Sequence, residues 1–208
     1  MLRGAHVSWY GMSTDTSYRK NERLIIRLAV VFGVIVGVLA LLLAAQLDND
    51  PDPVSPAEVY AFIEEIAPQS ELDPEFVYAL VWAESSLDSR AKSSVARGMM
   101  QLTKAAWKQV SDESYRHAWD WRTNIRVGID YLAHCREYLL RHGEFNYPLL
   151  AASYRYGPSR VKSRGFDIRE LKKPKNDIYL SIFNGNIHPV AIPASAVTSI
   201  APRAEFLD

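Results

Sequence analysis

The feature that most constrains this chain is an apolar run over residues 28–45 that contains no charged side chain. With the two residues that follow, the run has about the length that an α-helix needs to cross the hydrocarbon core of a bilayer. We therefore expect residues 28–47 to form a single membrane-spanning helix. A cleaved signal peptide usually has a shorter apolar core and a shorter leader, so we favour a retained anchor, although the pair Ala44-Ala45 leaves cleavage open as an alternative.

The charges on either side of the run predict its direction. Basic residues precede it (Arg19, Lys20, Arg23 and Arg27) and aspartates follow it (Asp48, Asp50 and Asp52). Because Lys and Arg are retained on the cytoplasmic side, we expect residues 1–27 to be a cytoplasmic leader, irregular up to Asn21, and the rest of the chain to lie outside the membrane. Gly33 and Gly37 form a pattern of small residues through which two such helices could pair weakly as a dimer.

Beyond the run, the patterns predict one all-α domain. Residues 48–54 carry prolines and aspartates and read as a linker, and residues 55–186 form the expected domain. Helices are expected at 55–66, 73–86, 104–111, 124–142, 148–157, 158–162 and 176–183, from N-cap residues, helix-initiating prolines and apolar spacing. No segment shows the sustained alternation of a strand. Residues 187–208 lack a period and are expected to form a flexible tail.

Composition limits the classes of function. The formal net charge is zero, yet from residue 90 onward 19 Lys and Arg face 11 Asp and Glu. The absence of a compact basic run argues against nucleic-acid binding; a solvated mixed surface explains the excess better than an anionic polymer partner. Cys135 is the single cysteine, so no intramolecular disulfide is possible. Its position between Leu132 and Leu139 on a helix predicts a core residue.

Glu84 is the first candidate for a functional residue, because it is a carboxylate on an apolar helix face. The face comprises Phe76, Val77, Leu80 and Val81, and Glu84 continues it at helical spacing. Burial disfavours the ionised form of a carboxyl group and raises its pKa, as a general acid requires. The alternative is a glutamate at the end of a helix whose carboxylate simply reaches solvent.

Four motifs occur in order around this residue. They are Glu84-Ser85, the segment 98–101 (Gly-Met-Met-Gln), the segment 124–132 (Asn-Ile-Arg-Val-Gly followed by Tyr-Leu) and the segment 152–158 (Ala-Ser-Tyr-Arg-Tyr-Gly-Pro). Their order and spacing resemble the catalytic domain of soluble lytic transglycosylases, which share the goose-type lysozyme fold. The resemblance covers residues 56–183 and implies that the all-α domain has this lysozyme-like fold.

The resemblance also implies a substrate and roles for residues. The substrate would be the glycan strands of peptidoglycan, with no metal and no other cofactor. Glu84 would protonate the oxygen between N-acetylmuramic acid and N-acetylglucosamine, then act as base on the muramoyl C6 hydroxyl to close a 1,6-anhydro ring. Ser85, either Ser93 or Ser94, and Gln101 would bind the sugar. Tyr154 would orient the carboxyl of Glu84; its alternative is a core aromatic with its hydroxyl bonded elsewhere.

Two residues depart from the family pattern: Arg155 stands where asparagine is usual, and Val95 where glycine is usual. We regard both as variation within an active enzyme. The sequence thus predicts a lytic transglycosylase anchored in the bacterial inner membrane, with its catalytic domain in the periplasm. The alternatives are a hydrolytic muramidase, or an inactive peptidoglycan-binding scaffold within an envelope-spanning machine.

Overall fold

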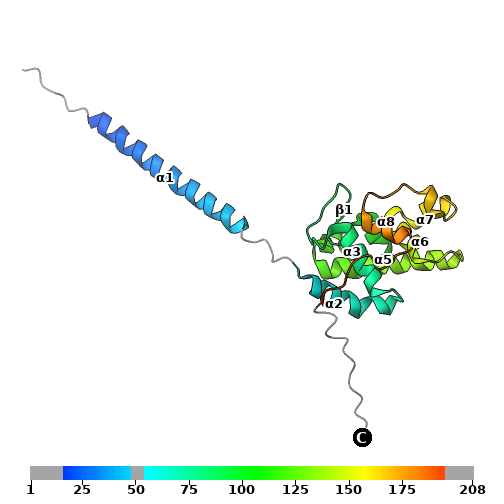
Figure 1. Cartoon of the computed structure of the whole chain (residues 1–208). Coiled ribbons are helices and arrows are strands. Elements are labelled where there is room, and N and C mark those ends of the chain that lie inside the picture. The colour runs from blue at the N-terminus through cyan, green and yellow to red at the C-terminus, as the bar shows by residue number, and fades with distance from the viewer. Residues whose placement is uncertain (1–15, 48–53, 195–208) are drawn as a thin grey trace, which may run out of the picture. The chain divides into compact units, whose positions relative to one another are not determined.

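The computed structural model describes residues 16–47 and 54–194 of the 208-residue chain. These residues fall into two units, the helix α1 (Thr16–Leu47) and a compact domain of residues 54–194 (Figure 1). The first part of the predicted leader (1–15), the predicted linker up to residue 53 and the last part of the predicted tail (195–208) lie outside the described residues.

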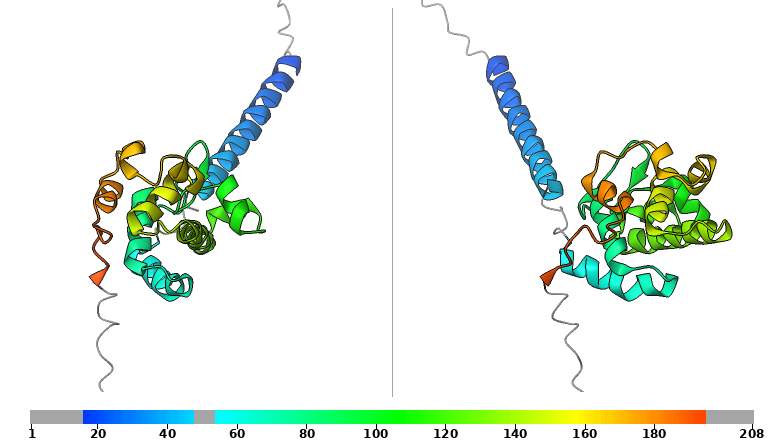
Figure 2. Two further views of the ribbon diagram at one scale, coloured as in Figure 1. Left: turned by 90° about the vertical axis from the view of Figure 1, so that its right-hand side faces the viewer. Right: turned by 45° about the vertical axis from the view of Figure 1, so that its right-hand side comes forward.

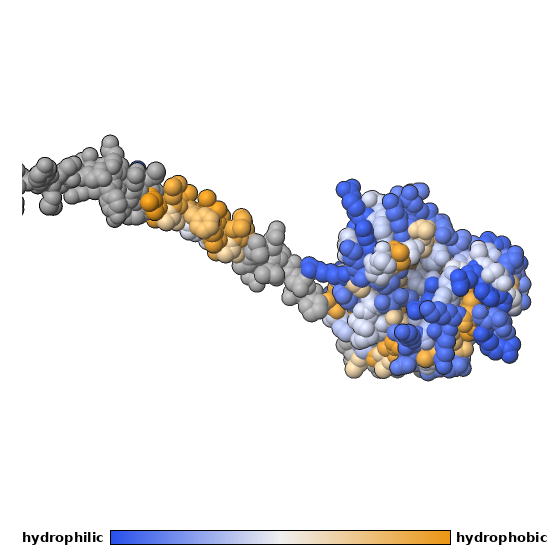
Figure 3. All heavy atoms as spheres, turned by 90° about the horizontal axis from the view of Figure 1, so that it is seen from above, coloured by the Kyte–Doolittle hydropathy of each residue, from blue (hydrophilic) through white to orange (hydrophobic). Residues whose placement is uncertain are grey.

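The first unit is one uninterrupted helix. Because α1 begins at Thr16, the expectation of an irregular leader up to Asn21 is wrong for residues 16–21. The described large apolar side chains of α1 are 49 to 73% exposed, and they form the orange band of this helix in Figure 3. Within the part of the chain that the structure describes, no helix combines the length and the apolarity needed to cross a membrane.

The first two helices of the domain start where their capping residues predict. Ser55 caps α2 (Pro56–Ile66): its hydroxyl accepts a hydrogen bond from the Glu58 N–H at 3.2 Å, and the Glu58 carboxylate accepts one from the Ser55 N–H. Asp73 caps α3 (Pro74–Ser85) by accepting the Phe76 N–H at 3.0 Å. Each cap satisfies backbone donors that a helix start leaves free.

The remaining elements confirm an all-α domain with one short addition. In chain order they are η1 (Ala67–Ser70), β1 (Ala96–Arg97), β2 (Leu102–Thr103), α4 (Lys104–Val110), η2 (Tyr115–Trp119), α5 (Trp121–Arg141), α6 (Tyr147–Tyr156), α7 (Pro158–Ser163), η3 (Ile168–Glu170) and α8 (Asp177–Phe183). The antiparallel hairpin of β1 and β2 was not predicted, because strands of two residues are too short to show a period of two.

Helix α5 runs through the middle of the domain. The left view of Figure 2 looks along its axis and shows the other helices arranged around it. It starts three residues earlier than predicted, because the Asp120 carboxylate caps it by accepting the Thr123 N–H at 2.8 Å. Cys135 on this helix is fully buried, and burial raises the pKa of its thiol to about 12. The prediction of a core cysteine is therefore confirmed.

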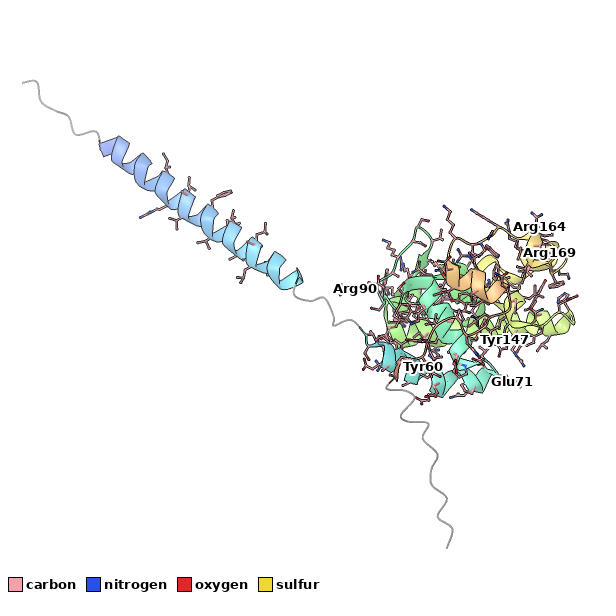
Figure 4. All side chains as sticks on the ribbon, in the orientation of Figure 1. Tyr60, Glu71, Arg90, Tyr147, Arg164 and Arg169 are labelled. Atoms are coloured by element: carbon pink, nitrogen blue, oxygen red, sulfur yellow. The ribbon has the colours of Figure 1, made fainter. Side chains whose placement is uncertain are left out.

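Helix α3 is held at both ends by other helices. Near its start, the rings of Tyr60 and Tyr78 pack edge to face at 5.3 Å, and the Tyr147 hydroxyl of α6 accepts the Asp73 N–H at 3.2 Å (Figure 4). At its end, the Asn176 side chain donates to the carbonyl of Ala83 at 3.2 Å. These contacts fix the position of the last turn of α3, which carries Glu84, against α8.

The compact domain extends past its predicted end at residue 186. Ile187, Val190 and Ile192 pack against the core, and the His188 Nε2 atom lies 3.0 Å from an oxygen of Asp73. A flexible tail from residue 187 is therefore a wrong prediction for residues 187–192. These apolar residues dock as an irregular segment, so no period in the sequence indicated their burial.

Candidate active site

An open cleft of about 580 Å³ crosses the domain, which is a volume typical of ligand sites. Its lining residues come from the end of α3, from the hairpin and its loop, from α4 and α5, and from the end of α6. They are Glu84, Ser93, Val95, Ala96, Gln101, Leu102, Thr103, Ala105, Ala106, Gln109, Tyr131, Tyr154, Arg155, Tyr156 and Gly157. Within the described residues that line it, Glu84 is the one carboxylate.

Glu84 projects from the last turn of α3 into this cleft. The helix ends one residue later, where Ser86 and Leu87 take left-handed backbone conformations with φ of 56° and 68°. Phe76, Val77, Leu80 and Val81 of α3 are fully buried, and the side chain of Glu84 itself is only 14% exposed. The structure thus gives Glu84 the largely buried position that the apolar stripe predicted, and the alternative of a fully solvated carboxylate is wrong.

Two side chains act on the same oxygen of Glu84. The Tyr179 hydroxyl of α8 donates a hydrogen bond to Oε1, and the Arg155 Nη1 atom of α6 lies 3.8 Å from this oxygen. Among the described residues, no side chain donates a hydrogen bond to the second oxygen, Oε2. This atom is also not one of the buried polar atoms without a partner, which are Trp82 Nε1, Arg136 Nε and Ser153 Oγ. Oε2 is therefore exposed, and it is the oxygen that remains open to the cleft.

The surroundings favour a protonated Glu84. Burial raises the pKa of this carboxyl above its ordinary value, whereas the hydrogen bond from Tyr179 and the positive charge of Arg155 act in the opposite direction. The net direction is upward. Burial, with a further contribution from the charge of Glu84, also raises the pKa values of Tyr154 and Tyr179 well above the usual range, so both phenols stay neutral. A neutral phenol can donate its hydrogen bond at any working pH.

Tyr154 does not have the contact that the family resemblance implied. Its hydroxyl donates to the backbone carbonyl of Met100 at 2.7 Å, which is the contact of a core aromatic that supports a loop. The hydroxyl that donates to Glu84 belongs to Tyr179, which was not predicted as a site residue. Tyr179 has the helical spacing of a core residue, three positions before Ile182, and nothing in that pattern indicates a partner 95 residues away.

Asn124 holds the loop that forms the floor of the cleft. Its fully buried amide accepts the Met100 N–H at 2.8 Å and donates to the carbonyls of Arg97 and Ala118 at 3.1 and 3.0 Å. Gly98 allows this close approach: its φ is +76°, and a Cβ there would lie 2.4 Å from the Asn124 side chain. The Gly-Met-Met-Gln and Asn-Ile motifs therefore meet in space.

The predicted sugar-binding residues have different positions. Gln101 lines the cleft, but its amide nitrogen donates to the carbonyls of Ala91 and Gly98 at 2.8 and 3.0 Å, which leaves its oxygen for a ligand. Ser93 lines the cleft and accepts the Ala96 N–H at 3.0 Å, whereas Ser94 is not in the lining. Ser85 is not in the lining either; its hydroxyl lies 3.4 Å from the carbonyl of Val81 within α3.

Both departures from the family pattern line the cleft. Val95 is 68% exposed at the tip of the loop that forms one wall. Arg155 lines the cleft beside Glu84, and its guanidinium lies 4.5 Å from the centroid of the Tyr179 ring. In residues 16–47 and 54–194, no group of His, Cys, Asp or Glu side chains has an arrangement that would hold a metal ion.

The contact of Tyr179 with Glu84 leads to a prediction. Under the role that the family resemblance implies for Glu84, we expect Tyr179→Phe to lower the rate of glycan cleavage about tenfold, because the carboxylate that forms when Glu84 gives up its proton loses a hydrogen bond. The ring is fully buried and its packing is retained, so the variant should fold. Initial rates on peptidoglycan measure the effect, with Tyr138→Phe on α5 as the control. Equal rates for Tyr179→Phe and wild type would show that the hydroxyl has no part in the reaction.

The fold and the site together define a class of protein: a mainly helical domain with an open cleft and one largely buried acid in its wall. The family model described as "Transglycosylase SLT domain" matches residues 61–177, more than half of the chain. The chain therefore belongs to this family, and the resemblance and the lysozyme-like helical fold are confirmed.

Among solved structures, the chain is similar to an inactive mutant of the lytic transglycosylase Slt from Pseudomonas aeruginosa, with 24% sequence identity and a TM-score of 0.45. The match covers 59% of this chain and 20% of that protein, so this chain spans about a fifth of its length. A comparison with curated protein sequences found no match.

Proposed function

We propose that this protein is a peptidoglycan lytic transglycosylase in which Glu84 is the single catalytic acid and base. The observation that carries the proposal is that, of the described residues lining the cleft, Glu84 alone is a carboxylate. Hydrolytic glycosidases usually need two carboxylates that flank the scissile bond. A lone acid suits a reaction in which the substrate supplies its own nucleophile.

The reaction would have two steps on the same carboxyl. Glu84 Oε2 gives its proton to the glycosidic oxygen, and the bond from that oxygen to the muramoyl C1 breaks, releasing N-acetylglucosamine as an alcohol. The carboxylate then takes the proton of the muramoyl C6 hydroxyl while the C6 oxygen bonds to C1. The products are a 1,6-anhydromuramoyl end and a free N-acetylglucosamine end, Glu84 is protonated again, and no water is consumed.

The partners on Oε1 support this cycle. The Tyr179 hydroxyl and the Arg155 guanidinium stabilise the carboxylate that exists between the two steps, without occupying the oxygen that transfers the proton. Burial favours the protonated state in which the cycle starts. The neighbours of Glu84 therefore balance the two charge states that the reaction uses in turn.

Digestion of purified sacculi by the full-length protein in detergent tests the proposal. Mass analysis of the soluble muropeptides should find 1,6-anhydromuramoyl ends and no reducing muramic acid ends. Reducing ends alone would identify the alternative, a muramidase in which Glu84 activates water. Equal sacculus binding by wild type and Glu84→Gln, with no product from either, would identify an inactive scaffold.

We further propose that residues 28–47 anchor the chain in the bacterial inner membrane, with the catalytic domain in the periplasm. Support comes from the uncharged run, from the basic residues before it and from the exposed apolar side chains of α1, whose contact with water would be costly. The side chains of residues 43–47 lie outside the described residues. We expect the full chain to remain in membranes after alkaline extraction, and a chain without residues 1–47 to be released. Release of the full chain would refute the anchor.

Two expectations about partners depend on the anchor. Gly33 and Gly37 lie one turn apart on α1, and a Cβ at either position would meet no atom within 4 Å. A weak dimer through this face would show as cross-linking that is lost when both glycines are replaced by leucine. Association with an envelope-spanning machine stays a prediction from the family resemblance.

A further inference from the structure

Arg155 occupies an unusual position for a cation, beside the acid of the cleft. It lies on the last turn of α6 with its side chain 31% exposed, and its Nη1 atom is 3.8 Å from Glu84 Oε1. This distance is too long for a direct hydrogen bond but is within the range of an ion pair. A guanidinium stays protonated at every pH at which the protein folds, so this positive charge is permanent.

The position of Arg155 is fixed by two rings. Its guanidinium carbon lies 4.5 Å from the centroid of the Tyr179 ring and 5.8 Å from that of Tyr156. A cation over the face of an aromatic ring is attracted by the ring's electron density. Because the hydroxyl of Tyr179 is bonded to Glu84 Oε1, the ring that orients Arg155 is itself attached to the acid. The three side chains form one connected unit from α3, α6 and α8.

We propose that Arg155 is a positioning residue whose permanent charge beside Oε1 sets the pH range in which Glu84 can donate its proton from Oε2. The proposal rests on the proposed function for the reaction that uses this proton, but not for the titration of Glu84 itself. Nothing in the family resemblance supplies this role, because asparagine is usual at position 155.

The groups that face Glu84 leave Arg155 as the source of charge. From α8 the acid faces Tyr179, and from α6 it faces Tyr154 and Arg155. Both phenols are neutral, because burial raises their pKa values well above the usual range. Among the described residues, Arg155 is the cation that forms an ion pair with Glu84. Its charge lowers the pKa of Glu84 against the upward effect of burial.

The direction of the effect follows from this sign. A positive charge next to the carboxylate stabilises the ionised form, so Glu84 with Arg155 is a stronger acid than Glu84 alone. Without the charge, Glu84 holds its proton to a higher pH and donates it less readily. The high-pH limb of the pH–rate profile should therefore shift to higher pH, while the maximal rate falls.

Three variants test the proposal: Arg155→Gln, which removes the charge, Arg155→Lys, which keeps it, and Arg160→Gln, an exposed control on α7 outside the cleft. In Arg155→Gln we expect the high-pH limb of kcat/KM on soluble glycan strands to move up by about one pH unit. In Arg155→Lys the limb should move by less than half as much, and in Arg160→Gln it should not move. An unchanged limb in Arg155→Gln, or equal shifts in the Gln and Lys variants, would overturn the proposal.

A direct titration separates this proposal from the proposed function. In the full chain labelled with carboxyl-¹³C glutamate, the Glu84 resonance is identified by its absence from Glu84→Gln. The midpoint of its titration should be higher in Arg155→Gln than in wild type, whether or not the protein cleaves glycan. A higher midpoint together with no cleavage by wild type would refute the proposed function but not the role of Arg155. If wild type cleaves glycan but the midpoint is the same in Arg155→Gln, the role of Arg155 is refuted alone. Arg155 is partly exposed, so both of its variants should fold.

Discussion

Replacing Glu84 by glutamine is expected to abolish glycan cleavage, with a loss of at least about 10³-fold in rate. Glutamine has nearly the same shape as glutamate and can still accept the hydrogen bond from Tyr179, but it has no proton to give. The cleft contains no second carboxylate among its described residues that could take over. Release of soluble muropeptides from sacculi by equal amounts of wild type and variant measures the loss.

The matched control is Glu65→Gln on α2, which removes an exposed carboxylate without touching the cleft. We expect this variant to keep the wild-type rate. Binding of Glu84→Gln to sacculi should also match wild type, because the change removes chemistry and no surface. Residual cleavage by Glu84→Gln at more than a few per cent of the wild-type rate would mean that another group is the acid.

Glu84→Gln should have a higher free energy of unfolding than wild type at neutral pH. Burial raises the pKa of Glu84 in the folded state, so between its ordinary and its raised value the folded chain binds more protons than the unfolded chain. The free energy of unfolding of wild type therefore falls as pH rises through this window, by about 1.4 kcal/mol for each unit of raised pKa. Glutamine does not titrate. Its advantage in denaturant unfolding should be absent at low pH and largest above the window; an equal difference at every pH would contradict this account.

Asn124→Ala is expected to cost about 3 to 5 kcal/mol of stability, the largest effect on folding predicted here. The change leaves the Met100 N–H and the carbonyls of Arg97 and Ala118 without their partner in a fully buried site. Since the same loop carries Gln101 and receives the hydroxyl of Tyr154, the variant that still folds should also lose activity.

Denaturant unfolding of Asn124→Ala and of the control Asn184→Ala measures this cost. Asn184 is exposed at the end of α8, so its variant should stay within about 0.5 kcal/mol of wild type. Asn124→Asp is informative too, since its side chain keeps an acceptor for Met100 but has no donor for the two carbonyls. A loss below about 1 kcal/mol in Asn124→Ala would show that the loop does not depend on this amide.

Much of the fold was predictable because local signals and packing agree. The caps Ser55 and Asp73 fix two helix starts by bonds within four residues, and the apolar stripe of α3 predicted that Glu84 would be buried. The cleft floor was predictable in part, since Gly98 and Gln101 belong to a recognisable motif. These features depend on short segments of sequence, where spacing carries the information.

The partners of Glu84 were not predictable, because they depend on how distant helices pack. Tyr179 has the spacing of an ordinary core residue, and the packing of α8 against the end of α3, seen in the bond from Asn176 to Ala83, has no signal in the local sequence. Arg155 was recognised as a departure from the family, but its ion pair depends on how the end of α6 lies beside the end of α3. Tyr154 has a recognisable position in its motif, yet its hydroxyl donates to the carbonyl of Met100, which lies 54 residues earlier in the chain.

The most direct test of the central claim is cleavage of glycan strands in water enriched in oxygen-18. If Glu84 uses the muramoyl C6 hydroxyl as nucleophile, the new muramoyl ends are 1,6-anhydro rings with no oxygen-18, and none form with Glu84→Gln. Reducing ends that carry one oxygen-18 would show that water is the nucleophile. That result would contradict the proposed reaction, in which Glu84 is protonated again by the muramoyl C6 hydroxyl and no water is consumed.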